Sequence, residues 1–310
     1  MRERVKDLVE TLSGGRAGGL LRTPIAGVRL FWAHAPGAAA PLVYDKGIVL
    51  VFQGRKVGFL GNRRFVYDPE NYLVLTLPLP FVCATEATRE SPLCGVFVDV
   101  PREDMAMIYA AMEEAPRPGT RLVGTAAAVS PVPVDAPMRR AADGLIEALL
   151  DPVAARVLGD AARRAVILAA LRGPMGGALD GLRDRGAEHG GIERAVDRMR
   201  ADLAADHPID DLARAAGMSV SSFHRAFRAR MDQTPLQYLK RLRLHTARRM
   251  IAFENVQVAV AAHRVGYESA SQFSREYKRL FGVAPATARG RAVKDPMAFA
   301  DPLEIRLAGE

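Results

Sequence analysis

Residues 217–251 read GMSVSSFHRAFRARMDQTPLQYLKRLRLHTARRMI, and residues 265–285 read VGYESASQFSREYKRLFGVAP. The second stretch repeats the pattern of the first, with Gly217 recurring as Gly266. A glycine at this place suits the left-handed conformation that ends one helix and lets the chain turn into the next. Because two copies are much stronger evidence than one, the sequence predicts a tandem pair of helix–turn–helix units.

The second helix of each unit is predicted over residues 220–230 and 270–281, with one apolar and one polar face. Aromatic residues four positions apart point inward on one side of each helix. They are Phe223 and Phe227 in the first unit and Phe273 and Tyr277 in the second. Small polar and basic residues lie on the opposite side, and a helix that reads the major groove requires such a face.

Base readers and phosphate contacts are expected on that polar face. Arginine can donate two parallel hydrogen bonds to guanine, so Arg225 and Arg275, at equivalent repeat positions, are the first candidates. The full set of candidate base readers is Ser221, His224, Arg225, Ser271, Gln272 and Arg275. Phosphate contacts, which position a protein without reading sequence, are expected from Ser222, Arg228, Arg230, Ser274, Lys278 and Arg279.

Gln272 has two open roles. It follows Ser269, the expected N-cap of the second reading helix, by three residues. Its side chain can therefore close a capping box instead of reaching a base, and the spacing alone does not decide between the two.

The repeated segment closely resembles the DNA-binding domain of the AraC/XylS family of transcription regulators over residues 208–289. The resemblance implies that the two units occupy successive major-groove segments of promoter DNA. Asp232 stands where the family usually has glycine, which implies a different exit from the first reading helix. Ala270 stands where proline is frequent, and the first position of a helix tolerates both.

Short β-rich runs separated by turn residues extend from about residue 25 to residue 100, which is typical of an antiparallel barrel or sandwich. The stretches VLVFQGRKVGFLG (49–61), FVYDPENYLVLTLPLP (65–80) and LRGPMGGAL (171–179) also resemble the N-terminal regulatory region of one branch of AraC-type regulators. That region is expected to be cupin-like. The expected fold class is therefore α+β, an N-terminal antiparallel β cupin-like barrel with helices followed by a C-terminal all-α tandem helix–turn–helix domain.

Five segments are expected along the chain. They are a lead-in (1–21), a cupin-like regulatory and dimerisation domain that ends in helices (22–185), a linker (186–191), the DNA-binding domain (192–290) and a tail (291–310). The lead-in is predicted as a short helix followed by a flexible glycine-containing stretch, and it lacks either phosphate-binding glycine pattern. Apolar stripes over 137–150 and 152–172 predict helices, and the family resemblance implies that these helices form a homodimer.

Charge is concentrated in the repeated segment. The chain of 310 residues carries a net charge of +8; between His207 and Gly290 there are 14 Lys and Arg against 6 Asp and Glu. The remaining residues hold 29 basic and 29 acidic groups, which cancel. A basic surplus confined to one segment is the electrostatic footprint of nucleic-acid binding.

Composition and targeting signals indicate a globular protein of the cytoplasm. The chain is 49% hydrophobic and 25% charged, and no apolar run is long enough to span a membrane, so no membrane partner is expected. The charged N-terminus lacks the apolar stretch of a signal peptide. Two cysteines make no disulfide framework and fit a reducing compartment.

The N-terminal region is expected to sense a small effector and to hold no metal or cofactor. A cupin metal site needs two or three histidines, whereas His34 is the only one between residues 22 and 135. Candidate effector residues are Trp32, His34, Gln53, Lys56, Tyr67 and Cys83, and core packing or a solvated strand face remains the alternative for each. Cys83 and Cys94 could sense oxidants if a cation such as Arg89 stabilised a thiolate; inert buried thiols are the alternative.

These observations predict a sequence-specific DNA-binding transcription regulator that is not an enzyme. Its expected partners are double-stranded promoter DNA, an unknown small-molecule effector and a second copy of the chain, with RNA polymerase as a further partner. Two alternatives stay open: an effector-independent architectural DNA binder, and a cupin-type enzyme fused to a DNA-binding module.

Overall fold

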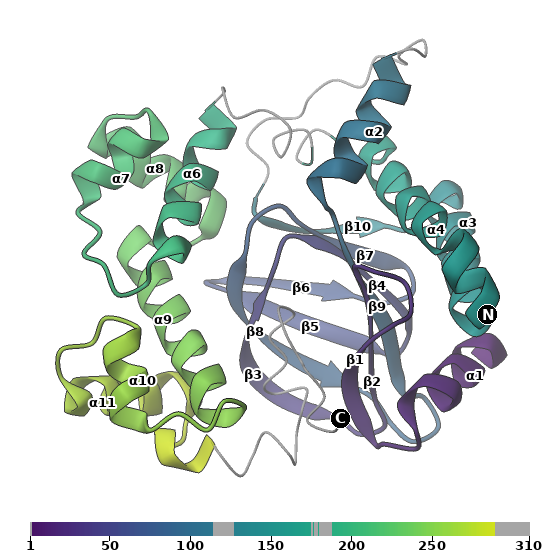
Figure 1. Ribbon diagram of the computed structural model, residues 1–310, viewed down its shortest axis with the longest axis horizontal. Helices are drawn as coiled ribbons and strands as arrows, with labels where there is room; N and C mark the ends of the chain where they lie inside the picture. Colours follow the sequence, from purple (N-terminus) through teal and green to yellow (C-terminus); the bar gives the residue numbers. More distant parts are fainter. Residues whose placement is uncertain (1, 114–126, 175, 177–178, 180–187, 289–310) are drawn as a thin grey trace.

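The structure is a computed structural model of the chain. It describes residues 2–113, 127–174, 176, 179 and 188–288. Two antiparallel β-sheets form the N-terminal half and a group of helices forms the C-terminal half (Figure 1). This arrangement confirms the expected fold class.

The larger sheet has six strands in the order β1-β2-β9-β4-β7-β10. Their bounds are β1 (Gly18–Arg22), β2 (Val28–Ala33), β9 (Leu93–Asp99), β4 (Gly47–Gln53), β7 (Asn71–Leu75) and β10 (Val129–Pro133). The smaller sheet has the order β3-β8-β5-β6. Its strands are β3 (Gly37–Tyr44), β8 (Leu79–Glu86), β5 (Arg55–Leu60) and β6 (Arg63–Tyr67).

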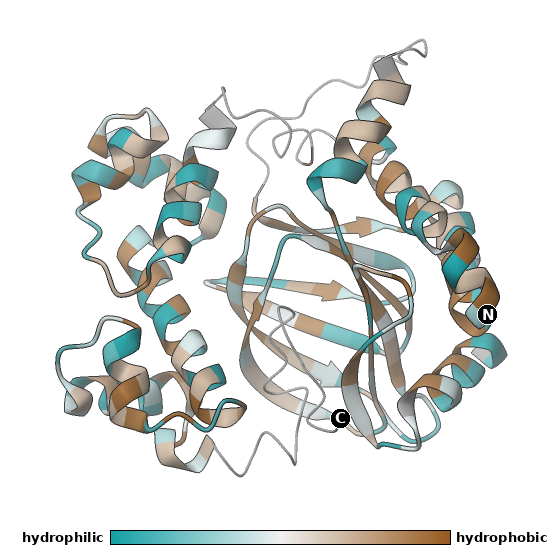
Figure 2. Ribbon diagram, viewed as in Figure 1, coloured by the Kyte–Doolittle hydropathy of each residue, from teal (hydrophilic) through white to brown (hydrophobic). Residues whose placement is uncertain are grey.

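The two faces of the larger sheet serve two different cores. On β4, Ile48 and Leu50 belong to a core shared with helices, whereas Val49 and Val51 face the interior between the sheets. Side chains alternate across a strand, so a continuous apolar run such as β4 is apolar on both faces. Figure 2 shows hydrophobic residues along the strands and on the helices, with hydrophilic stretches in both.

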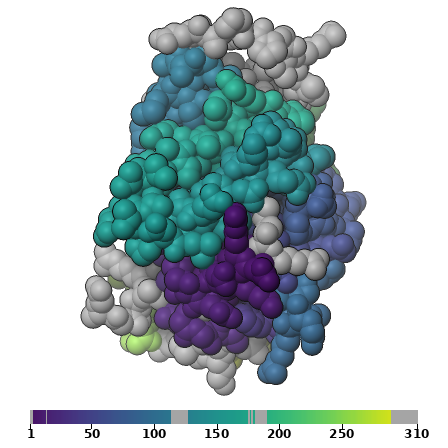
Figure 3. Space-filling model, turned by 90° about the vertical axis from the view of Figure 1, so that its right-hand side faces the viewer, coloured from purple at the N-terminus to yellow at the C-terminus, as the bar shows by residue number. Residues whose placement is uncertain are grey.

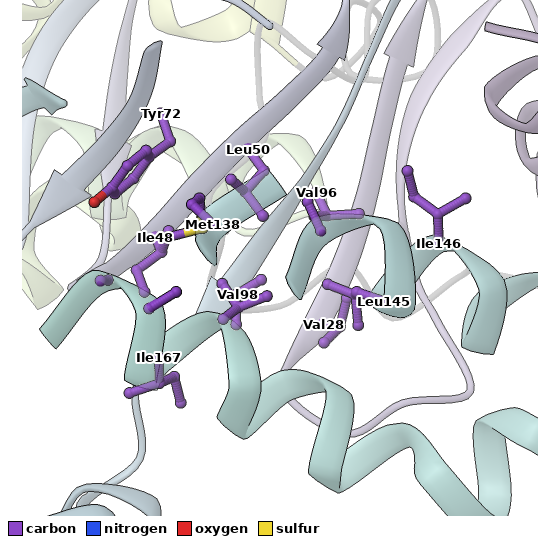
Figure 4. Packing of buried hydrophobic residues seen from close by; sticks show 14 of the residues in the cluster. Val28, Ile48, Leu50, Tyr72, Val96, Val98, Met138, Leu145, Ile146 and Ile167 are labelled. Atoms are coloured by element: carbon purple, nitrogen blue, oxygen red, sulfur yellow. The ribbon is translucent and has the colours of Figure 1, made fainter. Parts of the chain in front are cut away.

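Helices cover the outer face of the larger sheet. They are α1 (Arg2–Ser13), α3 (Ala136–Leu150) and α4 (Pro152–Arg172), and Figure 3 shows α3 and α4, in teal, at the surface on this side of the molecule. Met138, Leu145 and Ile167 from α3 and α4 pack on strand residues of β4 and β9 (Figure 4). A further helix, α2 (Arg102–Glu113), follows β9 and contacts α4.

The lead-in begins with the predicted helix, α1, but the expectation of a flexible glycine stretch after it is wrong for Gly18 and Gly19. Gly18 and Gly19 lie in β1, which pairs with β2 in antiparallel register. A Cβ on Gly19 would lie 2.8 Å from the Trp32 ring, so the absent side chain makes room for that indole. Gly18 and Gly19 therefore allow close packing of β1 against Trp32.

The C-terminal half contains α6 (Glu188–Ala201), α7 (Ile209–Ala216), α8 (Val220–Met231), α9 (Pro235–Ala252), α10 (Val258–Arg264), α11 (Ala270–Phe281) and a short 3₁₀ helix, η1 (Pro285–Thr287). Helix α6 begins at Glu188, so helix occupies the described part of the expected linker. Residues 186–187 of that linker, and the expected tail at 291–310, lie outside the described residues.

The two halves are in direct contact through α6, α8 and α9. Arg200 of α6 pairs with Asp45 in the β3–β4 turn at 3.0 Å between Nη2 and Oδ1. The Tyr238 hydroxyl of α9 donates to the carbonyl of Pro78 at 3.0 Å. One continuous apolar cluster includes interior residues such as Phe97 together with Phe227 of α8. The contact is thus both apolar and hydrogen-bonded.

Candidate nucleic-acid interface

The first helix–turn–helix unit consists of α7 and α8. Gly217 ends α7 with φ of 71°, and its amide donates to the carbonyls of Ala213 and Arg214. Ser219 then caps α8, its hydroxyl accepting from the Ser222 amide at 3.3 Å. The predicted glycine turn and serine cap are confirmed.

The second unit consists of α10 and α11 and has the same construction. Gly266 has φ of 84°. The hydroxyl of Ser269 accepts from the Gln272 amide at 3.3 Å, the same distance as the cap in the first unit. The sequence repeat is therefore also a repeat of backbone geometry.

The aromatic pairs hold both second helices to their units. Phe223 and Phe227 are fully buried with ring centroids 5.6 Å apart, and Phe273 and Tyr277 are fully buried at the same 5.6 Å. Burying one face in this way fixes the orientation of the opposite face toward solvent. Figure 1 places α8 and α11 on the side of the molecule away from α3 and α4.

The outward faces of α8 and α11 carry nearly all of the predicted DNA contacts. The exposed members are Ser221, His224, Arg225 and Arg228 on α8, and Ser271, Gln272, Arg275, Lys278 and Arg279 on α11. Ser222 and Ser274 are half-buried. The Ser274 hydroxyl donates to the carbonyl of Ala270 at 2.8 Å, which leaves its lone pairs to accept.

Arg230 is the exception, and its predicted phosphate contact is wrong. Its side chain lies on the buried side of α8 and the residue is only 5% exposed. The carbonyl of Arg230 accepts from the amide of Ala128, next to the larger sheet, at 2.9 Å. Burial lowers the pKa of the guanidinium, and the neighbouring Glu193 carboxylate opposes that shift. Arg230 thus faces the N-terminal half and not solvent.

The side chain of Gln272 does not close a capping box. Its Nε2 donates instead to Oε1 of Glu276, one turn further along α11, at 3.3 Å. Glu276 also accepts from Nζ of Lys240 at 3.0 Å and from the Tyr267 hydroxyl at 2.9 Å. The sequence interpretation missed this network; the only available signal was the spacing of Gln272 and Glu276 by four residues on one helix.

Asp232 ends α8 with the same left-handed backbone conformation that a glycine provides at the end of α11. It is left-handed with φ of 52°, and its amide donates to the Arg228 carbonyl at 2.9 Å. Gly282 ends α11 in the same way, with φ of 73° and a bond to the Lys278 carbonyl at 2.8 Å. The expectation of a different exit is therefore wrong in geometry.

Three of the effector candidates meet inside the two-sheet domain. The Tyr67 hydroxyl lies 3.1 Å from the Cys83 sulfur and 3.1 Å from the Tyr44 hydroxyl. Lys56, paired with Tyr67 across β5 and β6, is 1% exposed. Its ammonium lies 5.4 Å from the centroid of the Phe31 ring and 5.8 Å from that of Tyr44. Burial raises the pKa of Tyr67, which keeps its phenol neutral.

The other three candidates lie elsewhere. Trp32 faces the helix-covered side of the larger sheet, where its ring packs over Gly19 and its indole N–H donates to the carbonyl of Arg16 at 2.9 Å. His34 is half-buried just beyond β2, and Gln53 is buried at the end of β4. Trp32 is thus a packing residue, separated from the interior by the sheet itself.

The two cysteines lie in different parts of the N-terminal half, Cys94 in the core shared with the helices and Cys83 in the interior between the sheets. Both are buried, and burial raises the pKa of the Cys94 thiol to about 12. Cys83 lies in an apolar cluster and interacts with the phenol of Tyr67. Among the described residues no group of three or more metal-ligating side chains gathers. None of the helices described is long and apolar enough to cross a membrane.

Known proteins match both halves of the chain. Residues 24–178 match the family described as the AraC-type transcriptional regulator N-terminus, and residues 212–291 match a helix-turn-helix domain family. A putative AraC-like transcription regulator of Streptomyces lividans is 36% identical over 98 residues, 32% of each chain. The transcriptional activator RclR of Escherichia coli, named as specific for RCS, is 41% identical over 83 residues, 27% of this chain and 29% of that relative. The chain thus matches about a third of the length of these relatives.

A solved structure shares the arrangement of both halves. A variant of ToxT from Vibrio cholerae, in its apo form, superposes with a TM-score of 0.58 at 10% identity, covering 87% of this chain and 99% of that one. Wild-type ToxT bound to an unsaturated fatty acid gives a TM-score of 0.54 at 9% identity, with 84% and 93% covered. At such identities the likeness concerns the fold.

Proposed function

We propose, from the membership of this chain in the AraC-type family of transcriptional regulators, that it binds specific promoter DNA through α8 and α11. The observation that supports this most directly is the repeated geometry of the two units. Each presents a capped helix with a buried aromatic pair and an exposed arginine at the same repeat position, Arg225 in α8 and Arg275 in α11. A helix of this kind fits the major groove, where arginine recognises guanine through O6 and N7.

Arg225 and Arg275 are the proposed primary base readers, with Ser221, Ser271 and His224 beside them on the same faces. Arg228, Lys278 and Arg279 lie further along the helices and fit phosphate contacts, together with Ser222 and Ser274. Phosphate contacts contribute affinity that falls with salt, whereas base contacts determine which duplex is preferred.

DNA selection tests this proposal. Duplexes recovered from a random pool by the full-length protein are compared with scrambled duplexes by fluorescence anisotropy. Specific binding by wild type, reduced by about fivefold or more in Arg225→Ala and in Arg275→Ala, is expected because each loses a two-bond base contact. Lys278→Ala is the matched control, since it should weaken binding to all duplexes alike and lower the salt slope by about one. Recovery of no preferred sequence would refute the proposal.

We further propose that the N-terminal half senses a small molecule in the interior beside Lys56, Tyr67 and Cys83. The location is supported by the polar groups buried there among aromatic rings. Fatty-acid binding by the similarly folded ToxT makes a partly apolar effector a reasonable first class to screen. Tyr44 lines this interior and directly precedes Asp45, which pairs with Arg200 of α6, so a change at Tyr44 has a short route to the DNA-binding half.

Self-association is proposed on α4. Val153, Val157 and Leu158 are 59%, 73% and 55% exposed, and they lie on its first turns. An exposed apolar patch on a helix fits contact with a second copy. Analytical ultracentrifugation of wild type and Val157→Lys would test this, with a monomeric variant and a dimeric wild type expected.

RNA polymerase remains a proposed partner. The proposed location is the cytoplasm, where promoter DNA lies.

A further inference from the structure

The carboxylate of Glu276 ties together three parts of the second DNA-reading unit. It accepts from Lys240 of α9, from Tyr267 in the turn before α11, and from Gln272 in the first turn of α11. Its side chain is 12% exposed. Although burial raises the pKa of Glu276, hydrogen bonds from Lys240, Tyr267 and Gln272 outweigh that effect and lower it. The group is therefore a fixed anion that only accepts hydrogen bonds.

A fixed acceptor determines which way the exposed amide of Gln272 points. A carboxylate offers no N–H or O–H, so Gln272 must turn its Nε2 toward Glu276. One N–H is used there at 3.3 Å. When the N–H that points away from the carbonyl oxygen makes this bond, the oxygen and the second N–H lie side by side on the exposed residue.

One acceptor beside one donor matches a single base edge in the major groove. Adenine offers the N6 amino donor beside the N7 acceptor, so an amide held this way makes two bonds to it. Guanine offers two acceptors there, N7 and O6, and one of them would face the carbonyl oxygen of Gln272. Cytosine and thymine each allow a single bond.

We infer that Glu276 is a positioning residue that makes Gln272 a reader of adenine. The inference rests on the proposed function, since it requires that α11 enter the major groove of a specific duplex. It adds a base identity and a residue that acts through another, without contact with DNA.

The first unit provides an internal contrast. At the repeat positions of Tyr267, Gln272 and Glu276 it has Met218, Ser222 and Ala226, which cannot form the same network. Ser222 interacts with the Ser219 hydroxyl at 3.1 Å, and a hydroxyl both donates and accepts, so it does not distinguish adenine from guanine. The adenine preference is therefore confined to the second unit.

The test measures base preference separately from affinity. A duplex selected by the full-length protein is remade with each of the four bases at every position, and binding is measured by anisotropy. Wild type should prefer adenine at one position of the duplex. In Gln272→Ala this preference should fall by about fivefold or more. Glu276→Ala should remove the preference for adenine at the same position. A purely structural network would instead lower affinity for all four bases equally in Glu276→Ala.

Glu276→Gln guards against a variant that fails to fold. It keeps the volume of the side chain, and its amide can rotate to donate to the Gln272 oxygen, which lets Gln272 turn its amino group toward DNA. Guanine should then be tolerated at the adenine position.

An unchanged adenine preference in Glu276→Gln and Glu276→Ala overturns the inference, as does a selected duplex with no Gln272-dependent position. If the two arginine variants still lose specific binding in that case, the proposed function stands. If no duplex is selected, the proposed function fails with it.

Discussion

At the scale of single residues, Asp232 has a left-handed backbone conformation, which is unfavourable for a residue with a side chain but is required at the end of α8. The left-handed conformation costs an L-residue about 1 kcal/mol more than glycine, yet the exit of α8 needs it. We expect Asp232→Gly to raise the free energy of unfolding by about 0.5–1 kcal/mol, because strain falls while part of the gain is lost to the freer unfolded chain. Urea unfolding measures this, with Asp232→Ala as the control that should destabilise. A less stable glycine variant would contradict the account.

Residue identities in the sequence were sufficient to predict which faces of α8 and α11 are exposed, but not the burial of every long side chain on them. The aromatic spacing set the buried face of α8, so the exposure of Arg225 follows from it. Arg230 lies near the end of the same helix, and contact with the regulatory half decides its burial. Such a contact between distant segments leaves no periodic signal. The Glu276 network is hidden for the same reason, since Lys240 comes from α9.

At the scale of elements, a serine caps each of the two proposed reading helices, with the same 3.3 Å distance between the hydroxyl and the capped amide. Each hydroxyl satisfies an amide that the helix leaves without an intrahelical partner. Ser219→Ala and Ser269→Ala should each lower the free energy of unfolding by about 1 kcal/mol, as measured by urea unfolding. Serine-to-glycine changes at the same positions should cost only a few tenths of that amount. Equal losses for alanine and glycine would show that the caps contribute nothing specific.

Elements with strong periodic or turn signals were predictable, and those dependent on pairing were not. The β-rich runs predicted between about residues 25 and 100 contain β2, β4, β5, β7 and β9, and the apolar stripes over 137–150 and 152–172 correspond to α3 and α4. Strand β3 reads GAAAPLVY and β8 contains Pro80, residues with weak strand preference or no backbone N–H. These two strands pair with each other across the smaller sheet, and that pairing overrides their weak local preference.

At the scale of the whole molecule, a partly buried charge pair joins the two halves. Burial raises the pKa of Asp45, and the attraction of Arg200 opposes that shift without cancelling it. Ionising the Asp45 carboxylate is therefore less favourable in the folded protein than in the unfolded chain. The free energy of unfolding consequently falls as the pH rises from the ordinary pKa of an aspartate through the raised pKa of Asp45. We therefore expect the Asp45–Arg200 pair to fix the relative orientation of the two halves more than it raises the free energy of unfolding.

Separating the partners tests that view. Arg200→Met should lower the free energy of unfolding by about 1–3 kcal/mol, because it leaves the Asp45 carboxylate without its closest cation. Adding Asp45→Asn to that variant should restore most of the loss, because no charge is then buried. The double-mutant cycle is read by urea unfolding of the full chain. A double variant less stable than Arg200→Met would contradict the argument.

The central claim is that α8 and α11 read two successive major-groove segments of one duplex. Hydroxyl-radical footprinting of the full-length protein on a selected duplex tests it most directly. We predict two protected segments on one face of the DNA, about one helical turn apart, with Arg225→Ala weakening one segment and Arg275→Ala the other. A single protected segment, or equal loss of both segments in each variant, would contradict the two-unit account.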